Sequence, residues 1–154
     1  MKVFTAAIIL VLISAPAAQA PREGASPVYG GPHAVVLQYH FFGDGYPAST
    51  SVTVERFREH LELIKKTGCE VRPLREIVQK IRDGKPLPDP CVAITIDDAY
   101  SSVYDNAFPV LKEYGWPATV FVPTDAVDRG MGGYMSWEQI REMASGGMGF
   151  CVFN

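Results

Sequence analysis

The chain has 154 residues, of which 20% are charged, and its formal net charge is -3. This length is enough for one modest domain with a hydrophobic core. The small, mixed charge provides neither a basic stripe for nucleic acid nor a long acidic tail, so the composition indicates a globular protein with no nucleic-acid partner.

Residues 1–20 predict a secretory signal peptide. Lys2 is followed by an apolar run over 3–15 and then by small residues through Ala20, which is the order of a signal sequence. The run is short for a spanning helix, so we expect removal of the segment and no stable membrane span afterwards. Cleavage after Ala20 is one site, and cleavage after Ala17 is the alternative. Either site predicts export to the periplasm or the extracellular space.

The folded domain is predicted to start after a linker. Residues 21–33 are rich in Pro, Gly and Ser and show no periodicity, so they predict that linker. The apolar run that follows, 34–39, predicts a first buried strand ending at His40. The aromatic stretch 41–47 is predicted to be a loop. His40 therefore stands at the carboxyl end of a buried strand, where a structural role and a functional role are equally open.

Two helices with a short strand between them come next. Apolar residues recur at helical spacing over 53–68, with Thr at the N-cap and Gly at the end. A second helix is predicted over 73–84, opened by Pro and closed by Gly. Residues 69–71 form the strand between them. His60 lies among charged residues, which predicts a solvated position on the first helix.

The run 91–96 is apolar, β-branched and of strand length, and it ends in the carboxylates Asp97 and Asp98. Such a run is typical of a parallel strand buried on both faces. Ionised carboxylates are almost never fully buried without a partner, so the pair is expected where the strand emerges. Two adjacent carboxylates suit proton transfer and cation binding, whereas a lone Asp would more often cap the next helix.

The rest of the chain continues the alternation of helices and strands. It predicts a helix over 103–114 with a kink or restart at Pro109, followed by a buried strand over 118–122. A long Gly-rich loop over 124–134 leads to a helix over 136–144, which a capping box opens, and to a last strand over 148–153. This order predicts an α/β fold with a parallel sheet and covering helices. Functional groups in such folds gather at the carboxyl ends of the strands.

Three cysteines, Cys69, Cys91 and Cys151, have a spacing that matches no zinc pattern. An exported protein could pair two of them in a disulfide. Their positions in predicted strands favour buried thiols, because Cys often fills space in a core as a small apolar residue.

Residues 94–100, Ile-Thr-Ile-Asp-Asp-Ala-Tyr, resemble the first motif of the polysaccharide deacetylase family, the carbohydrate esterases (family 4) with a NodB-homology domain. The family's usual form is Thr-Phe-Asp-Asp-Gly. The pair Tyr39-His40 and the segments 117–122 and 134–137 also resemble the family. Together these matches cover nearly all of the chain after residue 33. The resemblance implies that 34–154 is the amino-terminal part of a deformed (β/α) barrel.

The resemblance also implies metal-dependent removal of acetyl groups from an N- or O-acetylated polysaccharide. It gives Asp97 the role of general base and Asp98 the role of ligand to a divalent metal, usually zinc. By the same analogy, pocket residues are expected at His40, Tyr100, Tyr39 and Trp137. The backbone N–H of Tyr100 could also help to stabilise an oxyanion.

Two departures from the family pattern change what is expected of this chain. Ala99 stands where the family most often has Gly, a change of one methyl group that we expect to be tolerated. The family completes its metal site with two His spaced four apart in the stretch that here reads 148–154, which contains no His. We therefore expect an incomplete domain, cut short by a frameshift, an early stop or a gene-model error. Such a chain would be inactive alone and prone to aggregate through an open sheet edge.

Other readings stay open. A noncatalytic exported protein could bind sugar on an aromatic surface of Tyr39, Phe41, Phe42, Tyr46, Tyr100 and Trp137. A glycosidase is disfavoured, because adjacent carboxylates do not easily flank one glycosidic bond at the separation of roughly 5 Å or more that this chemistry needs. A phosphatase is disfavoured because no Gly-rich phosphate loop is found. The substrate is open among chitin-like oligomers, peptidoglycan, xylan and exported biofilm polysaccharides.

Overall fold

Strand β5 (Cys91–Ile96) is the centre of a five-stranded sheet in the computed structural model, which describes residues 33–44 and 47–153. The sheet order is β1-β5-β6-β7, with β4 beside the start of β5, and every pairing is parallel. The other strands are β1 (Val35–Tyr39), β4 (Glu70–Val71), β6 (Thr119–Pro123) and β7 (Gly149–Phe153). The predicted parallel sheet is thus confirmed, whereas the signal peptide at 1–20, linker residues 21–32 and Tyr46 lie outside the described residues.

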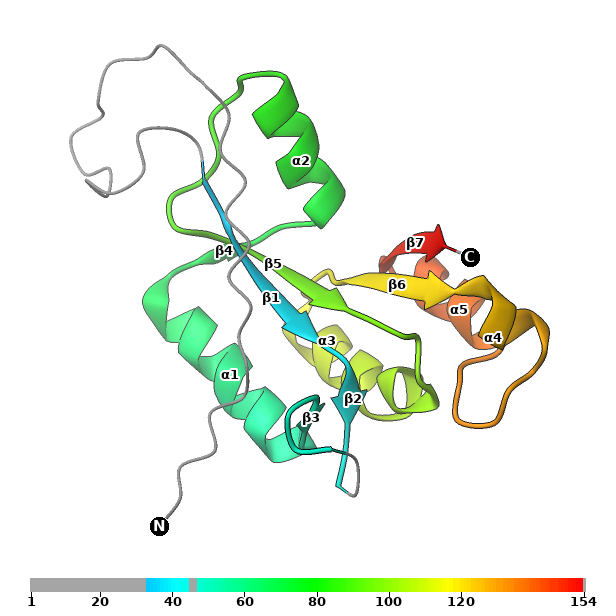
Figure 1. Cartoon of the computed structure of the whole chain (residues 1–154). Coiled ribbons are helices and arrows are strands. Elements are labelled where there is room, and N and C mark those ends of the chain that lie inside the picture. Colours follow the sequence, from blue (N-terminus) through cyan, green and yellow to red (C-terminus); the bar gives the residue numbers. More distant parts are fainter. Residues whose placement is uncertain (1–32, 45–46, 154) are drawn as a thin grey trace.

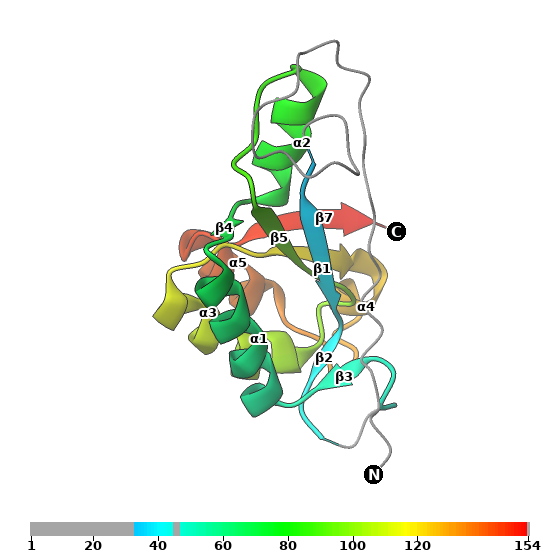
Figure 2. The same ribbon diagram turned by 90° about the vertical axis from the view of Figure 1, so that its left-hand side faces the viewer.

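Helices cover the sheet as the alternation predicts. Three of them, α1 (Val54–Thr67), α3 (Phe108–Tyr114) and α5 (Trp137–Ser145), gather on one side of the strands (Figures 1 and 2). The helix α2 (Leu74–Arg82) lies beside the ends where β1 and β5 begin. No helix within the described ranges has the length and apolar character needed to cross a membrane.

The two faces of the β1–β5 pair have different cores, because side chains alternate along a strand. One face, which includes Ile94 and Ile96, packs in the main core with α1, α3 and α5. The other face, which includes Cys91 and Ala93, packs in a smaller core with α2. Toward the carboxyl ends of the two strands, this second face extends past α2 (Figure 2). The candidate site lies at that end of the face.

Several local predictions are confirmed. The side chain of Thr53 caps α1 by accepting from the backbone N–H of Arg56 at 3.2 Å, and Gly68 ends the helix at φ +72°. The restart near Pro109 takes the form of a π-helical segment, η1 (Val103–Ala107), followed directly by α3. The capping box of Ser136 with Gln139 opens α5.

The structure adds elements where loops were predicted. Phe41 and Phe42 form the short strand β2 (Phe41–Phe42), which pairs in parallel with β3 (Ser51–Val52). Phe42 is fully buried, so this aromatic segment belongs partly to the core. The predicted loop 124–134 begins with a short helix, α4 (Thr124–Asp128), which buries Ala126 and Val127. Both segments gain structure because their apolar side chains find places in the core.

The cysteine prediction is correct only in part. All three cysteines are free thiols, but Cys91 alone is buried. Cys69 is half-buried, and Cys151 is exposed. The prediction of burial is wrong for Cys151 because its strand, β7, pairs only with β6 within the described chain and leaves its last residues in solvent.

His60 is not the solvated residue that the sequence predicts. Its Nδ1 lies 3.1 Å from the hydroxyl of Tyr39, whose ring also packs edge-on against Phe57 at 5.1 Å between centroids. Burial lowers the pKa of His60, and the positive charge of Arg56 lowers it further. Burial also raises the pKa of Tyr39. A neutral imidazole is therefore part of the folded state.

This arrangement predicts that acid destabilises the fold partly through His60. Its pKa is lowered in the folded state, so its contribution to the free energy of unfolding is complete above the ordinary pKa of about 6.5. That contribution is lost as the pH falls and the unfolded chain takes up the proton first. Urea unfolding at pH 8 and pH 5 should show a smaller pH dependence for His60→Gln than for the wild type. Equal pH dependence in the two proteins would contradict this assignment.

Candidate active site

The parallel register of β1 and β5 places two polar segments side by side. Tyr39 is paired with Ile96, the last residue of β5. One step further on, the backbone N–H of Asp97 donates to the carbonyl of Tyr39 at 2.8 Å. His40 and Asp97 therefore leave neighbouring strands at the same edge of the sheet, as their positions in the sequence predict.

Three titratable side chains meet at this edge. His40 Nδ1 lies 3.1 Å from Asp98 Oδ2, a distance at which a ring N–H donates to a carboxylate. His40 Nε2 lies 4.0 Å from Asp97 Oδ2. The exposed fractions of the His40, Asp97 and Asp98 side chains are 29%, 25% and 38%. The imidazole thus lies between two carboxylates that a solute can reach from outside.

Gln38 is a site residue that the sequence analysis missed. Its side-chain amide donates to Asp97 Oδ2. Gln38 lies on β1 and His40 follows the end of the strand, two positions after Gln38, so both point to the face that bears Asp97. The available signal was a single amide residue within an otherwise apolar strand, two positions before His40.

The turn after β5 has a left-handed backbone without glycine. Asp98 has φ +69° and Ala99 has φ +49°. This conformation costs roughly 1–2 kcal/mol for a residue such as Ala, whereas Asp adopts it more readily because its short polar side chain can form local hydrogen bonds. The Ala99 side chain is fully buried, and its carbonyl accepts from the Met135 N–H at 2.9 Å. Packing and this hydrogen bond hold the turn in a shape that Gly adopts without strain.

Aromatic rings line the turn. The ring of Tyr100 lies 5.7 Å from that of Phe41 and 5.2 Å from that of Tyr134, measured between centroids. Tyr100 and Tyr134 also form an isolated antiparallel bridge. All three residues are half-buried. Tyr100 is therefore placed next to the carboxylates by segments on both sides of it.

The other aromatic candidates have contacts elsewhere in the fold. Tyr39 points to the opposite face of β1 and is buried in the main core, as is Phe42. The indole N–H of Trp137 donates to Asp128 at 2.8 Å, which joins the start of α5 to the end of α4. The aromatic sugar-binding surface proposed as an alternative therefore loses Tyr39 and Phe42 to the core, and Tyr46 lies outside the described residues.

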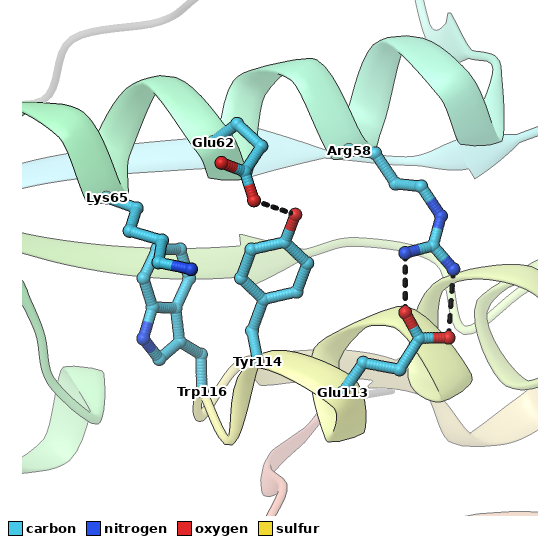
Figure 3. A pocket seen from close by; sticks show the side chains of 6 residues that line it. All are labelled: Arg58, Glu62, Lys65, Glu113, Tyr114 and Trp116. Carbon is cyan, nitrogen blue, oxygen red and sulfur yellow. Dashed lines mark hydrogen bonds and ion pairs between the residues drawn. The ribbon is translucent and has the colours of Figure 1, made fainter.

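A separate surface hollow of about 390 Å³ lies between α1 and α3 (Figure 3). Its charged groups are bonded to one another across the two helices. The Arg58 guanidinium donates to both carboxylate oxygens of Glu113 at 2.5 and 2.9 Å, and the Tyr114 hydroxyl donates to Glu62 at 2.7 Å. These bonds lower the pKa of Glu113 and raise that of Tyr114. The hollow therefore contains interhelical contacts and is not the candidate site.

The described residues fit only part of a zinc site. Asp98 and His40 offer carboxylate and imidazole donors of the kinds that zinc takes, but a catalytic zinc has three protein ligands. Within residues 33–44 and 47–153, no group of three or more His, Cys, Asp or Glu side chains is arranged to hold a metal ion. If Asp98 binds a metal, His40 is the one neighbouring side chain among the described residues that could bind it as well.

Comparisons with known proteins agree on one family. The sequence profile described as polysaccharide deacetylase matches residues 84–152. A poly-beta-1,6-N-acetyl-D-glucosamine N-deacetylase of Escherichia coli (strain K12) is 33% identical over an alignment of 109 residues. The match covers 61% of this chain and 16% of that protein. The Staphylococcus epidermidis protein of the same name is 38% identical over 77 residues, 50% of this chain and 26% of that protein.

A solved structure shows the same similarity in three dimensions. The structure of IcaB from Ammonifex degensii matches with a TM-score of 0.69 and 33% identity. The match covers 79% of this chain and 53% of that chain. The chain thus spans about half of this structural relative and a smaller share of the two sequence relatives.

The left-handed turn after β5 predicts that a larger side chain lowers the free energy of unfolding more at Ala99 than at Ala93. Ala99→Val adds β-branched bulk to a fully buried site at positive φ, whereas Ala93→Val adds the same bulk to a fully buried site in β5. Overpacking costs about 1–3 kcal/mol at either site. Ala99→Val should lose more than Ala93→Val, because a β-branched residue fits a left-handed backbone less well than the Ala that already occupies it, whereas it fits a strand well. Urea unfolding of both variants measures the difference, and equal losses would contradict the assigned backbone strain.

Proposed function

Because the chain belongs to the polysaccharide deacetylase family, we propose that its carboxylates at the end of β5 form part of a site that removes acetyl groups from an N-acetylated polysaccharide. The observation that carries this proposal is the meeting of Asp97, Asp98 and His40 at the carboxyl ends of β1 and β5. The matched segment 84–152 includes both carboxylates.

Asp97 is the general base in this proposal. Its carboxylate is one quarter exposed, so it can accept the proton of a water molecule that attacks the acetyl carbonyl carbon. The bond between that carbon and the sugar nitrogen then breaks. Asp97 passes the accepted proton to the nitrogen, which leaves as an amine, while the acyl group with the water oxygen leaves as acetate. The backbone N–H of Tyr100, on the adjacent turn, is proposed to stabilise the oxyanion.

Asp98 is the proposed metal ligand, with zinc as the metal. Its Oδ2 faces His40 Nδ1, so one carboxylate and one imidazole lie together. These two donors are fewer than the three protein ligands of a catalytic zinc. We therefore propose that the described residues bind zinc weakly and that the chain without added metal is inactive.

The proposed substrate is a polymer of β-1,6-linked N-acetylglucosamine. This choice is supported by the E. coli and S. epidermidis relatives, whose names specify poly-beta-1,6-N-acetyl-D-glucosamine. Export directed by the signal peptide predicted at 1–20 would bring the chain to a polysaccharide outside the cytoplasm. Chitin-like oligomers, peptidoglycan and acetylated xylan are the competing substrates.

Zinc retention tests the metal proposal. After dialysis against metal-free buffer, the chain should hold well below one equivalent of zinc, because only two donors meet at the site. Metal content is measured by mass spectrometry for the wild type and for Asp98→Ala. One full equivalent that disappears in Asp98→Ala, together with turnover, would refute the proposed inactivity of the chain alone.

Acetate release tests the reaction. With zinc in excess, acetate should appear from β-1,6-linked N-acetylglucosamine oligomers, and Asp97→Asn should lower the rate by about 100-fold or more. Asp105→Asn, an equal change at an exposed position of η1, is the matched control and should keep the wild-type rate. Binding of acetylated oligomers with no acetate release at any zinc concentration would instead support the noncatalytic sugar-binding alternative.

A further inference from the structure

Gln38 occupies an unusual position for an amide side chain. It lies next to the last residue of β1, a strand whose other residues are Val35, Val36, Leu37 and Tyr39. A half-buried amide costs free energy unless it is hydrogen-bonded. Its side-chain NH₂ donates to Asp97 Oδ2, which satisfies part of this need.

The contact acts on one oxygen of the Asp97 carboxylate. Oδ2 accepts from Gln38 and is also the oxygen that faces His40, at 4.0 Å from Nε2. Among the residues that the structure describes, none donates to Oδ1. Gln38 thus engages one carboxylate oxygen and leaves the other for a water molecule or a substrate.

We propose that Gln38 is a positioning residue, which fixes the rotation of the Asp97 carboxylate so that Oδ1 faces the reacting water. The inference rests on the proposed function, because it assumes that Asp97 is the base. The terminal torsion of Asp is broad and has no strong preference of its own. A donor held by the rigid β1–β5 pairing supplies that preference. Small misplacements of a reacting group can lower a rate by up to about 100-fold.

A matched pair of variants separates this role from a merely structural one. Gln38→Met keeps an unbranched side chain of similar length and removes the donor. Gln79→Met makes the same change on α2, where the Gln79 amide donates to Asp83 at 2.9 Å, in a separate Gln–Asp contact. Both variants should keep the wild-type unfolding midpoint.

The first readout is the Asp97 side chain itself, measured by NMR in the full 154-residue chain. The carboxyl carbon shift of Asp97, which reports the surroundings of both carboxylate oxygens, should be the same in the wild type and in Gln79→Met. In Gln38→Met this shift should move, because the donor to Oδ2 is lost and the terminal torsion of Asp97 is no longer held. An unchanged Asp97 in Gln38→Met would overturn the proposal, whether or not the chain is active.

The second readout is acetate release in excess zinc. Gln38→Met should lower kcat about 10-fold and leave KM within about twofold, since the side chain orients the base and does not hold substrate. A wild-type kcat in Gln38→Met would also overturn the proposal. If the wild type itself releases no acetate, the proposed function fails for this chain, whereas the NMR readout still decides whether Gln38 orients Asp97.

Discussion

The parallel pairing of β1 with β5 is the interaction on which the candidate site depends. Its register runs from Val35 opposite Val92 to Tyr39 opposite Ile96, so the two strands end level with each other. The Asp97 N–H continues the ladder by one hydrogen bond beyond the last paired residues. A shift by one residue would turn each β1 side chain to the other face and remove His40 from the carboxylates. The site is therefore specified by the burial of the apolar side chains that fix this register.

The turn after β5 connects the site to a distant part of the chain. The carbonyl of Ala99 accepts from Met135, and the N–H of Ser101 donates to the carbonyl of Gly133 at 2.8 Å. These bonds join the turn to the segment that leads into α5. The positive φ of Asp98 and Ala99 persists because the surrounding contacts determine it. The direction of the Asp98 side chain therefore depends on residues more than thirty positions away.

The sequence alone predicted the elements that have a strong local signal. The apolar run of β5, the carboxylates after it and His40 after β1 could be placed at one edge of a parallel sheet, and the structure confirms that placement. Residues whose role depends on the facing strand could not be assigned. Tyr39 and Gln38 are neighbours on β1, yet the first packs in the core and the second bonds Asp97. The sequence of β1 does not show which of these two side chains points into the core. That choice depends on what packs against each face of the strand.

The placement of α2 explains why polar side chains are tolerated on that second face. The helix covers the beginning of the β1–β5 pair and packs on Cys91 and Ala93. Toward the carboxyl ends the face is free of α2, and polar groups there bond one another or the backbone. The hydroxyl of Thr95 donates to the carbonyl of Leu37 at 3.0 Å, as Gln38 donates to Asp97. One face thus changes along its length from apolar packing to a hydrogen-bonded edge, so the core and the site are built from the same two strands.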